Sequence, residues 1–104
     1  MVPYEVIVQP TADQHIRDIY TNSAQQGRWS FTQTDAYVTE LEQRIYSLDQ
    51  NPQRFSYDEH TQRSRQYRSF QHGAHKVFFS INESTQTVGV IAVLPSRMNY
   101  SDQL

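Results

Sequence analysis

Two apolar segments in the second half of the chain constrain its fold more than any other feature. Residues 74–81 and 87–94 are rich in Val, Ile and Phe, and the five polar residues 82–86 separate them. Short runs of β-branched and aromatic residues joined by a polar turn are typical of antiparallel strands. Because apolar residues occupy both faces of the two segments, we expect them to be central strands of a sheet.

A third strand is predicted just before this pair. Residues 67–70 have strand character, and His72 and Gly73 supply the turn that follows. The three segments therefore predict an antiparallel meander. Residues 53–65 are polar without periodicity and predict a flexible connection, and the polar residues 96–104 predict a partly disordered tail.

The first half of the chain begins with a strand and continues with a helix. Residues 4–8 alternate in the manner of a short strand, which Pro10 ends. Thr11 with Gln14 three residues later forms a capping-box pattern, so we expect the first helix to start there. Gly27 predicts its end, since glycine adopts the left-handed conformation at little cost.

A second helix is expected after Ser30 or Thr32, either of which can cap it, and before Asn51 and Pro52. Its apolar stripe consists of Val38, Leu41, Ile45 and Leu48. The order of elements predicts a single α+β domain over residues 1–104. In this two-layer fold, an N-terminal strand and a helical hairpin pack on an antiparallel sheet (β-α-α-β-β-β).

Composition excludes several kinds of chemistry. The chain has no cysteine, which rules out disulfides, thiolate nucleophiles and Cys-ligated zinc. Its longest apolar stretch, residues 88–94, is too short to span a bilayer, and no signal peptide is visible, so we expect a cytoplasmic protein. The net charge of −2 makes general polyanion binding unfavourable. Residues 51–80 nevertheless carry a local excess of basic residues, which is either an anion-facing patch or a solvated face.

Basic and imidazole side chains gather around the first turn of the meander and just beyond its last strand. They are Arg68, His72, His75, Lys76 and Arg97. An arginine fork suits phosphate or carboxylate, and histidine transfers protons near neutral pH. The alternative is that they are solvated strand and turn residues, with His75 bordering the core. His72 and His75 have no carboxylate nearby to complete a metal site, so we expect neither a metal nor a cofactor.

The order of these segments resembles toxins of the RelE/ParE superfamily over nearly the whole chain. The resemblance lies in ADQHIRDIY (12–20), RIYSLDQNP (44–52), QYRSFQHGAHKVFFSI (66–81) and VGVIAVLPSRMN (88–99). The third segment is the most specific and is closer to the ParE branch. The sequence departs from the family pattern at Pro95, where a histidine is common, and at Met98 and Asn99, where an acidic residue is frequent.

The resemblance implies a toxin of a type II toxin–antitoxin pair that inhibits DNA gyrase by trapping its cleaved DNA complex. Arg68, His72, His75, Lys76 and Arg97 would then contact the target or support the contact. Neither enzymatic activity nor direct sequence-specific nucleic-acid binding is expected of such a protein.

The alternative is a RelE-like, ribosome-dependent mRNA endoribonuclease, in which Arg68, Lys76 and Arg97 hold phosphates and His75 or Tyr100 transfers a proton. A third hypothesis is a degenerate, non-toxic member that acts only as an interaction domain. In each case we expect a cognate antitoxin to cover the helical hairpin at Tyr37, Leu41 and Tyr46.

Overall fold

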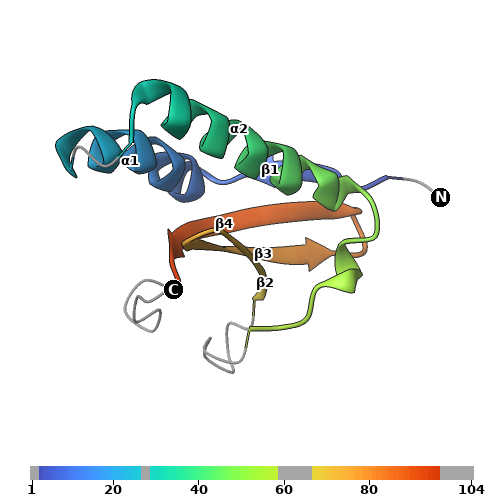
Figure 1. Cartoon of the computed structure of the whole chain (residues 1–104). Coiled ribbons are helices and arrows are strands. Elements are labelled where there is room, and N and C mark those ends of the chain that lie inside the picture. Colours follow the sequence, from blue (N-terminus) through green and yellow to red (C-terminus); the bar gives the residue numbers. More distant parts are fainter. Residues whose placement is uncertain (1–2, 27–28, 59–66, 97–104) are drawn as a thin grey trace.

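The computed structural model describes residues 3–26, 29–58 and 67–96, in which two helices form one layer and a four-stranded sheet forms the other (Figure 1). The elements are β1 (Glu5–Val8), α1 (Pro10–Gln26), α2 (Phe31–Tyr46), two 3₁₀ helices (Ser47–Asp49 and Pro52–Arg54), β2 (Arg68–His72), β3 (His75–Asn82) and β4 (Thr87–Pro95). The predicted α+β class and element order are confirmed. None of the described helices is long and apolar enough to cross a membrane.

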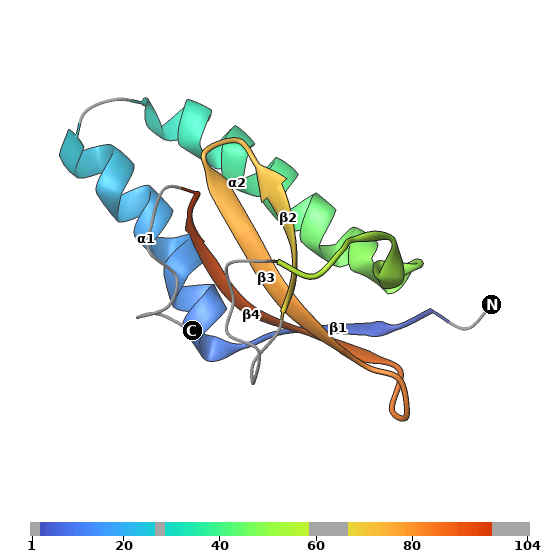
Figure 2. The same cartoon turned by 90° about the horizontal axis from the view of Figure 1, so that it is seen from below.

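The sheet has the strand order β1-β4-β3-β2, which can be followed from below in Figure 2. β2, β3 and β4 form the predicted antiparallel meander, with His72 opposite His75 and Val77 opposite Val93. β1 pairs with β4 in parallel, so the sheet is mixed and is antiparallel only over β2–β4. The long connection that a parallel pair requires runs from β1 through the helical hairpin and then through β2 and β3 before β4 returns beside β1.

The two helix starts differ in how they are capped. α1 begins at Pro10, where a missing N–H costs nothing, and the Asp13 N–H donates to the carbonyl of Gln9 at 2.9 Å. Thr11 therefore lies inside the first turn, and its predicted role as the cap is wrong. α2 has a complete capping box between Ser30 and Gln33, which selects Ser30 from the two predicted caps.

The segment after α2 is more ordered than its polar sequence predicts. Leu48 is fully buried in the first 3₁₀ helix, and Asn51 adopts a left-handed φ of 50° before Pro52. Asp58 is buried, and Tyr57 pairs with Arg68 as an isolated bridge. The predicted connection therefore packs on the sheet up to residue 58. Its remainder, the predicted helix end at Gly27 and the predicted tail beyond residue 96 lie outside the described residues.

Apolar side chains fill both faces of the sheet, as the strand patterns predict. The helices bury one face, where Val38, Leu41, Ile45, Val77, Phe79, Val88 and Val90 are 0 to 1% exposed. A smaller cluster of Phe78, Ala92 and Leu94, with Tyr67 against it, lies on the opposite face. Full burial of one such side chain is worth about 1.5–3 kcal/mol, so this core holds the hairpin on the sheet.

Candidate functional site

Tyr37 of α2 connects the helical layer to the turn between β2 and β3. Its hydroxyl donates to the backbone carbonyl of His72 at 2.8 Å and lies 2.7 Å from Nδ1 of His75. Its ring packs against both imidazoles, with centroids 4.8 Å and 5.6 Å away. The turn approaches the ring so closely that a Cβ on Gly73 would lie 2.7 Å from the Tyr37 side chain, and Gly73 has φ +56°. A glycine is therefore required at this position.

The single hydroxyl proton of Tyr37 determines the tautomer of His75. Because that proton goes to the His72 carbonyl, the short contact with Nδ1 requires a hydrogen on the His75 ring. In the neutral ring, Nε2 of His75 is then a hydrogen-bond acceptor. Burial lowers the pKa of His75, and the neighbouring His72 lowers it further, so the neutral form dominates at neutral pH. Burial also raises the pKa of Tyr37, an effect that the Ala74 backbone N–H opposes.

His72 lies beneath Tyr37 and is only 6% exposed. Its Nδ1 lies 3.3 Å from Nη1 of Arg44, which also donates to the carbonyl of Gln71 at 2.8 Å. Nδ1 therefore accepts, and Nε2 carries the proton but is buried without a hydrogen-bond partner.

A cavity of about 360 Å³ opens beside His75 at the end of the sheet. It is lined by Ile19, Asn22, Ser23, Trp29, Ala74, His75 and Pro95. A second hollow of about 270 Å³ shares Ile19, Asn22, His75 and Pro95 with it and adds His15 and Asp18. Trp29 stacks on Tyr37 with ring centroids 4.9 Å apart, so the tyrosine and its two histidines adjoin this cavity.

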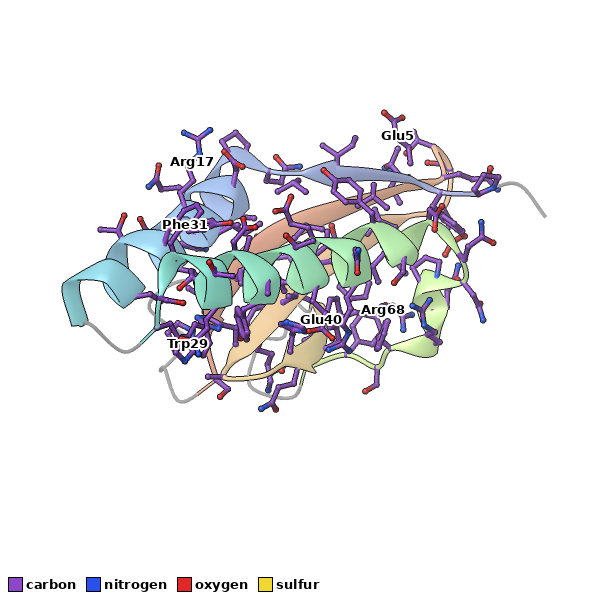
Figure 3. The ribbon with its side chains drawn as sticks, turned by 45° about the horizontal axis from the view of Figure 1, so that its top comes forward. Glu5, Arg17, Trp29, Phe31, Glu40 and Arg68 are labelled. Atoms are coloured by element: carbon purple, nitrogen blue, oxygen red, sulfur yellow. The ribbon has the colours of Figure 1, made fainter. Side chains whose placement is uncertain are left out.

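Arg68 lies far from this cavity, since it and Trp29 are near opposite ends of α2 (Figure 3). Its guanidinium donates to the carbonyls of Phe55 at 2.6 Å and Gln53 at 3.3 Å. It also stacks on Tyr57 at 4.4 Å from the ring centroid. Arg68 is therefore a half-buried residue that holds the segment before β2, and not the exposed side chain that the sequence suggests.

Lys76 points to the face of the sheet opposite His75, because the two residues are adjacent in β3. Its Nζ lies 2.8 Å from the carboxylate of Asp58, which is buried, and Ser69 donates to the same oxygen at 2.9 Å. The structure therefore confirms that Arg68 and Lys76 lie on neighbouring strands, but it does not bring Arg68, Lys76 and the histidines into one patch. The remaining candidates, Arg97 and Tyr100, lie outside the described residues.

The residues expected to face an antitoxin are also separated. Leu41 is fully buried in the core, so it is not on the surface of this structure. Tyr37 is half-buried against the histidines, and Tyr46 is 53% exposed. All four residues of the apolar stripe of α2 and the segment after it (Val38, Leu41, Ile45 and Leu48) are buried in the core.

Sequence reasoning missed four residues that organise these sites. Tyr37 was treated as a surface aromatic, and Arg44, Asp58 and His15 were not considered. His15 accepts the Val93 N–H at 3.2 Å through Nδ1, and burial lowers its pKa, although Asp18 opposes this effect. The usable signal was periodicity, because His15 lies three residues after the buried Ala12 and four residues before the buried Ile19. Within the described residues, no group of three or more His, Asp or Glu side chains could hold a metal.

Comparisons with known proteins agree on the fold. The chain is similar to the toxin–antitoxin complex RelBE2 from Mycobacterium tuberculosis, with a TM-score of 0.64, 16% identity and coverage of 90% of this chain and 99% of that one. It is also similar to the archaeal RelE–RelB complex from Pyrococcus horikoshii OT3, with a TM-score of 0.60, 13% identity and coverage of 94% and 100%. No curated protein matches the sequence.

The decisive comparison is with a protein family. The family described as "ParE toxin of type II toxin-antitoxin system, parDE" matches residues 6–100, which include every described helix and almost every strand residue. The chain therefore belongs to the ParE toxin family of type II toxin–antitoxin systems.

Proposed function

We propose that this toxin inhibits DNA gyrase by trapping its cleaved DNA complex and does not cut RNA. The supporting observation is that all five described cations have partners within the chain. Arg17 pairs with Asp13, Lys76 pairs with Asp58, and Arg44, Arg54 and Arg68 donate to backbone carbonyls. Cleavage of RNA requires cations that contact phosphates and stabilise the charged transition state. The five described cations already have partners within the chain, which argues against such a role for them.

A supercoiling assay tests this proposal directly. Purified gyrase with relaxed plasmid should lose supercoiling activity as toxin is added, and linear DNA should accumulate after denaturation of the enzyme. Addition of the cognate antitoxin should restore supercoiling. Normal supercoiling at a large excess of folded toxin, together with cuts in mRNA on translating ribosomes, would show that the proposal is wrong.

We further propose that a cognate antitoxin covers the outer side of the helical hairpin. The two solved structures described above are complexes of a toxin with its antitoxin. A hollow of about 210 Å³ between α1 and α2 suits an amphipathic helix, because its lining combines apolar and charged side chains: Val8, Asp13, Ile16, Arg17, Tyr20, Glu42, Ile45 and Tyr46. Of the three residues expected to face the antitoxin, Tyr46 is the one that lines this hollow.

A matched pair of variants tests this surface. Tyr46→Ala should weaken the complex with the product of the adjacent gene, because exposed tyrosines are frequent anchors at interfaces. Tyr57→Ala is the control, since Tyr57 is similarly exposed at 56% but lies beside β2. If both variants bind the antitoxin equally well, the antitoxin does not use this groove.

The endoribonuclease is the second candidate because of the geometry of His75. A neutral imidazole with Nδ1 fixed by Tyr37 and an accepting Nε2 beside a cavity has the arrangement of a general base. Loss of mRNA cleavage in His75→Phe, with gyrase unaffected by the unaltered toxin, would favour this candidate.

A further inference from the structure

We propose that the cavity beside His75 binds a neutral aromatic group that carries one hydroxyl or ring N–H donor, such as a phenol or an indole. This inference does not depend on whether gyrase or mRNA is the target. It follows from the shape of the cavity, the polarity of its lining and the hydrogen bonds that fix its two histidines.

The walls of the cavity suit a flat apolar ring. Ile19, Ala74 and Pro95 provide aliphatic surface, and the indole of Trp29 provides an aromatic one. Trp29 is 41% exposed although it stacks on Tyr37, so part of its surface remains available to a ligand. A volume of about 360 Å³ falls in the range of small-molecule sites and accommodates a single substituted ring.

The polar groups of the cavity select the class of ligand. Because Tyr37 holds Nδ1–H of His75, the remaining Nε2 of the neutral ring is an acceptor, and His75 lines the cavity, so a ligand that carries a donor can bond to it. Asn22 adds an amide that can donate or accept. His15, which lines the adjoining hollow, has the opposite tautomer to His75. Its Nδ1 accepts the Val93 N–H, so Nε2 of the neutral ring carries the proton and is a donor.

The charges of the described lining residues exclude the main competing class of ligand, which is an anion such as a phosphate or a carboxylate. Both histidines have pKa values lowered by burial, so they are neutral at neutral pH. Among the described residues that line the two hollows, Asp18 is the only one with a charged side chain, and it is an anion. A phosphate or carboxylate would therefore find no cation among these lining residues, whereas a neutral donor gains a hydrogen bond worth about 1 kcal/mol.

Binding of p-cresol to the full-length toxin tests the proposal. Trp29 is the only tryptophan in the chain, so selective excitation of its indole should give a saturable change in emission. Amide resonances of Asn22, Ala74 and His75 should shift in the same titration. The control ligand 4-methylanisole has the same ring and oxygen but no donor, and it should bind roughly fivefold more weakly.

The variant His75→Phe separates the hydrogen bond from the shape of the cavity. It keeps a ring at this position but removes Nε2, so p-cresol and 4-methylanisole should bind it with equal affinity. Its circular dichroism and melting temperature establish whether it is folded. If it does not fold, the same comparison is made on the unaltered toxin as the pH is lowered. Protonation of His75 should then remove the preference for p-cresol, and it should need a lower pH than an ordinary histidine because burial lowers the pKa of His75.

Several groups face His75 and belong to that pH comparison. They are Tyr37 on α2, His72 on β2, and His15 and Asp18 on α1. A His15→Gln variant should keep the pH effect if His75 is responsible for it. Loss of the effect in that variant would overturn the assignment to His75.

A peptide identifies the source of the aromatic group. If a short peptide with one central tyrosine binds, and its phenylalanine counterpart binds more weakly, the cavity receives a side chain of a protein partner. If p-cresol binds but neither peptide does, the ligand is a free small molecule. Absence of saturable binding by p-cresol, equal binding of p-cresol and 4-methylanisole, or amide shifts away from the cavity would each overturn the proposal.

Discussion

Lys76 Nζ lies 2.8 Å from the carboxylate of Asp58, and this ion pair fastens the segment after α2 to the face of the sheet opposite the helices. The side chain of Asp58 is 3% exposed and that of Lys76 is 20% exposed. Removal of one member leaves the other poorly solvated, which is far more costly than loss of a surface pair. The pair therefore makes Lys76 a structural residue in addition to any role at a target.

Lys76→Met should lower the free energy of unfolding by about 2–4 kcal/mol, because the buried Asp58 carboxylate loses the cation that balances its charge. Urea unfolding of the purified toxin measures this change. Arg17→Met is the matched control, since Arg17 pairs with Asp13 but is 72% exposed, and it should cost less than about 0.5 kcal/mol. Similar losses in the two variants would contradict the importance assigned to the buried pair.

Gly73→Ala should destabilise the toxin by about 2–4 kcal/mol, because a Cβ would meet the Tyr37 ring at 2.7 Å and the residue has a positive φ. Gly89→Ala is the control in the neighbouring strand. Its Cβ would come no closer than 3.5 Å to another side chain, so its cost should be below about 1 kcal/mol. Thermal unfolding followed by circular dichroism compares the two, and equal melting temperatures would show that the turn can move away from Tyr37.

The fold was largely predictable because the spacing of apolar residues within each short segment indicates whether the segment is a strand or a helix. The period of the apolar residues distinguishes strands from helices, and Val77 and Val93 lie where that period places them. The position of β1 was not predictable, since its parallel pairing with β4 joins segments about 80 residues apart. The start of α1 was misplaced because proline at the first helical position is as good a signal as the Thr11 capping pattern.

The candidate site was less predictable because it depends on which face each side chain occupies. The sequence correctly places His72 and His75 near the turn, but it groups Lys76 with them although adjacent strand residues point to opposite faces. Tyr37 is 38 residues from His75. Only the packing of α2 on the sheet brings the two together, and no local pattern in one sequence encodes it.

Arg68→Ala should lower the stability of the toxin by about 1–3 kcal/mol, because the carbonyls of Gln53 and Phe55 lose their donor and Tyr57 loses its stacking partner. Arg68→Lys keeps the charge but not the fork, so it should recover only part of the loss. Toxicity upon expression and the melting temperature should be measured together. Unchanged stability with lost toxicity would instead identify Arg68 as a target contact.

The free energy of unfolding should decrease as the pH falls below about 6.5, because His15 and His75 are less basic in the folded toxin than in the unfolded chain. Burial lowers both pKa values, and His72 adds to the effect at His75, so the unfolded chain binds more protons in this range. Stability is then full above the unfolded pKa and is lost as the pH falls toward the folded values. Glu83, whose pKa is lowered by hydrogen bonds from Tyr4 and Gln53, adds a further loss in a more acidic range.

Urea unfolding between about pH 7 and pH 5 measures the histidine effect, since histidine titrates there. His15→Gln should flatten part of the dependence while an amide oxygen still accepts the Val93 N–H. His75→Phe should flatten another part, and the double variant should show the smallest slope. Stability that rises on acidification would mean that a histidine gains an anionic partner upon folding. That outcome would also remove the neutral His75 on which the proposed aromatic site depends.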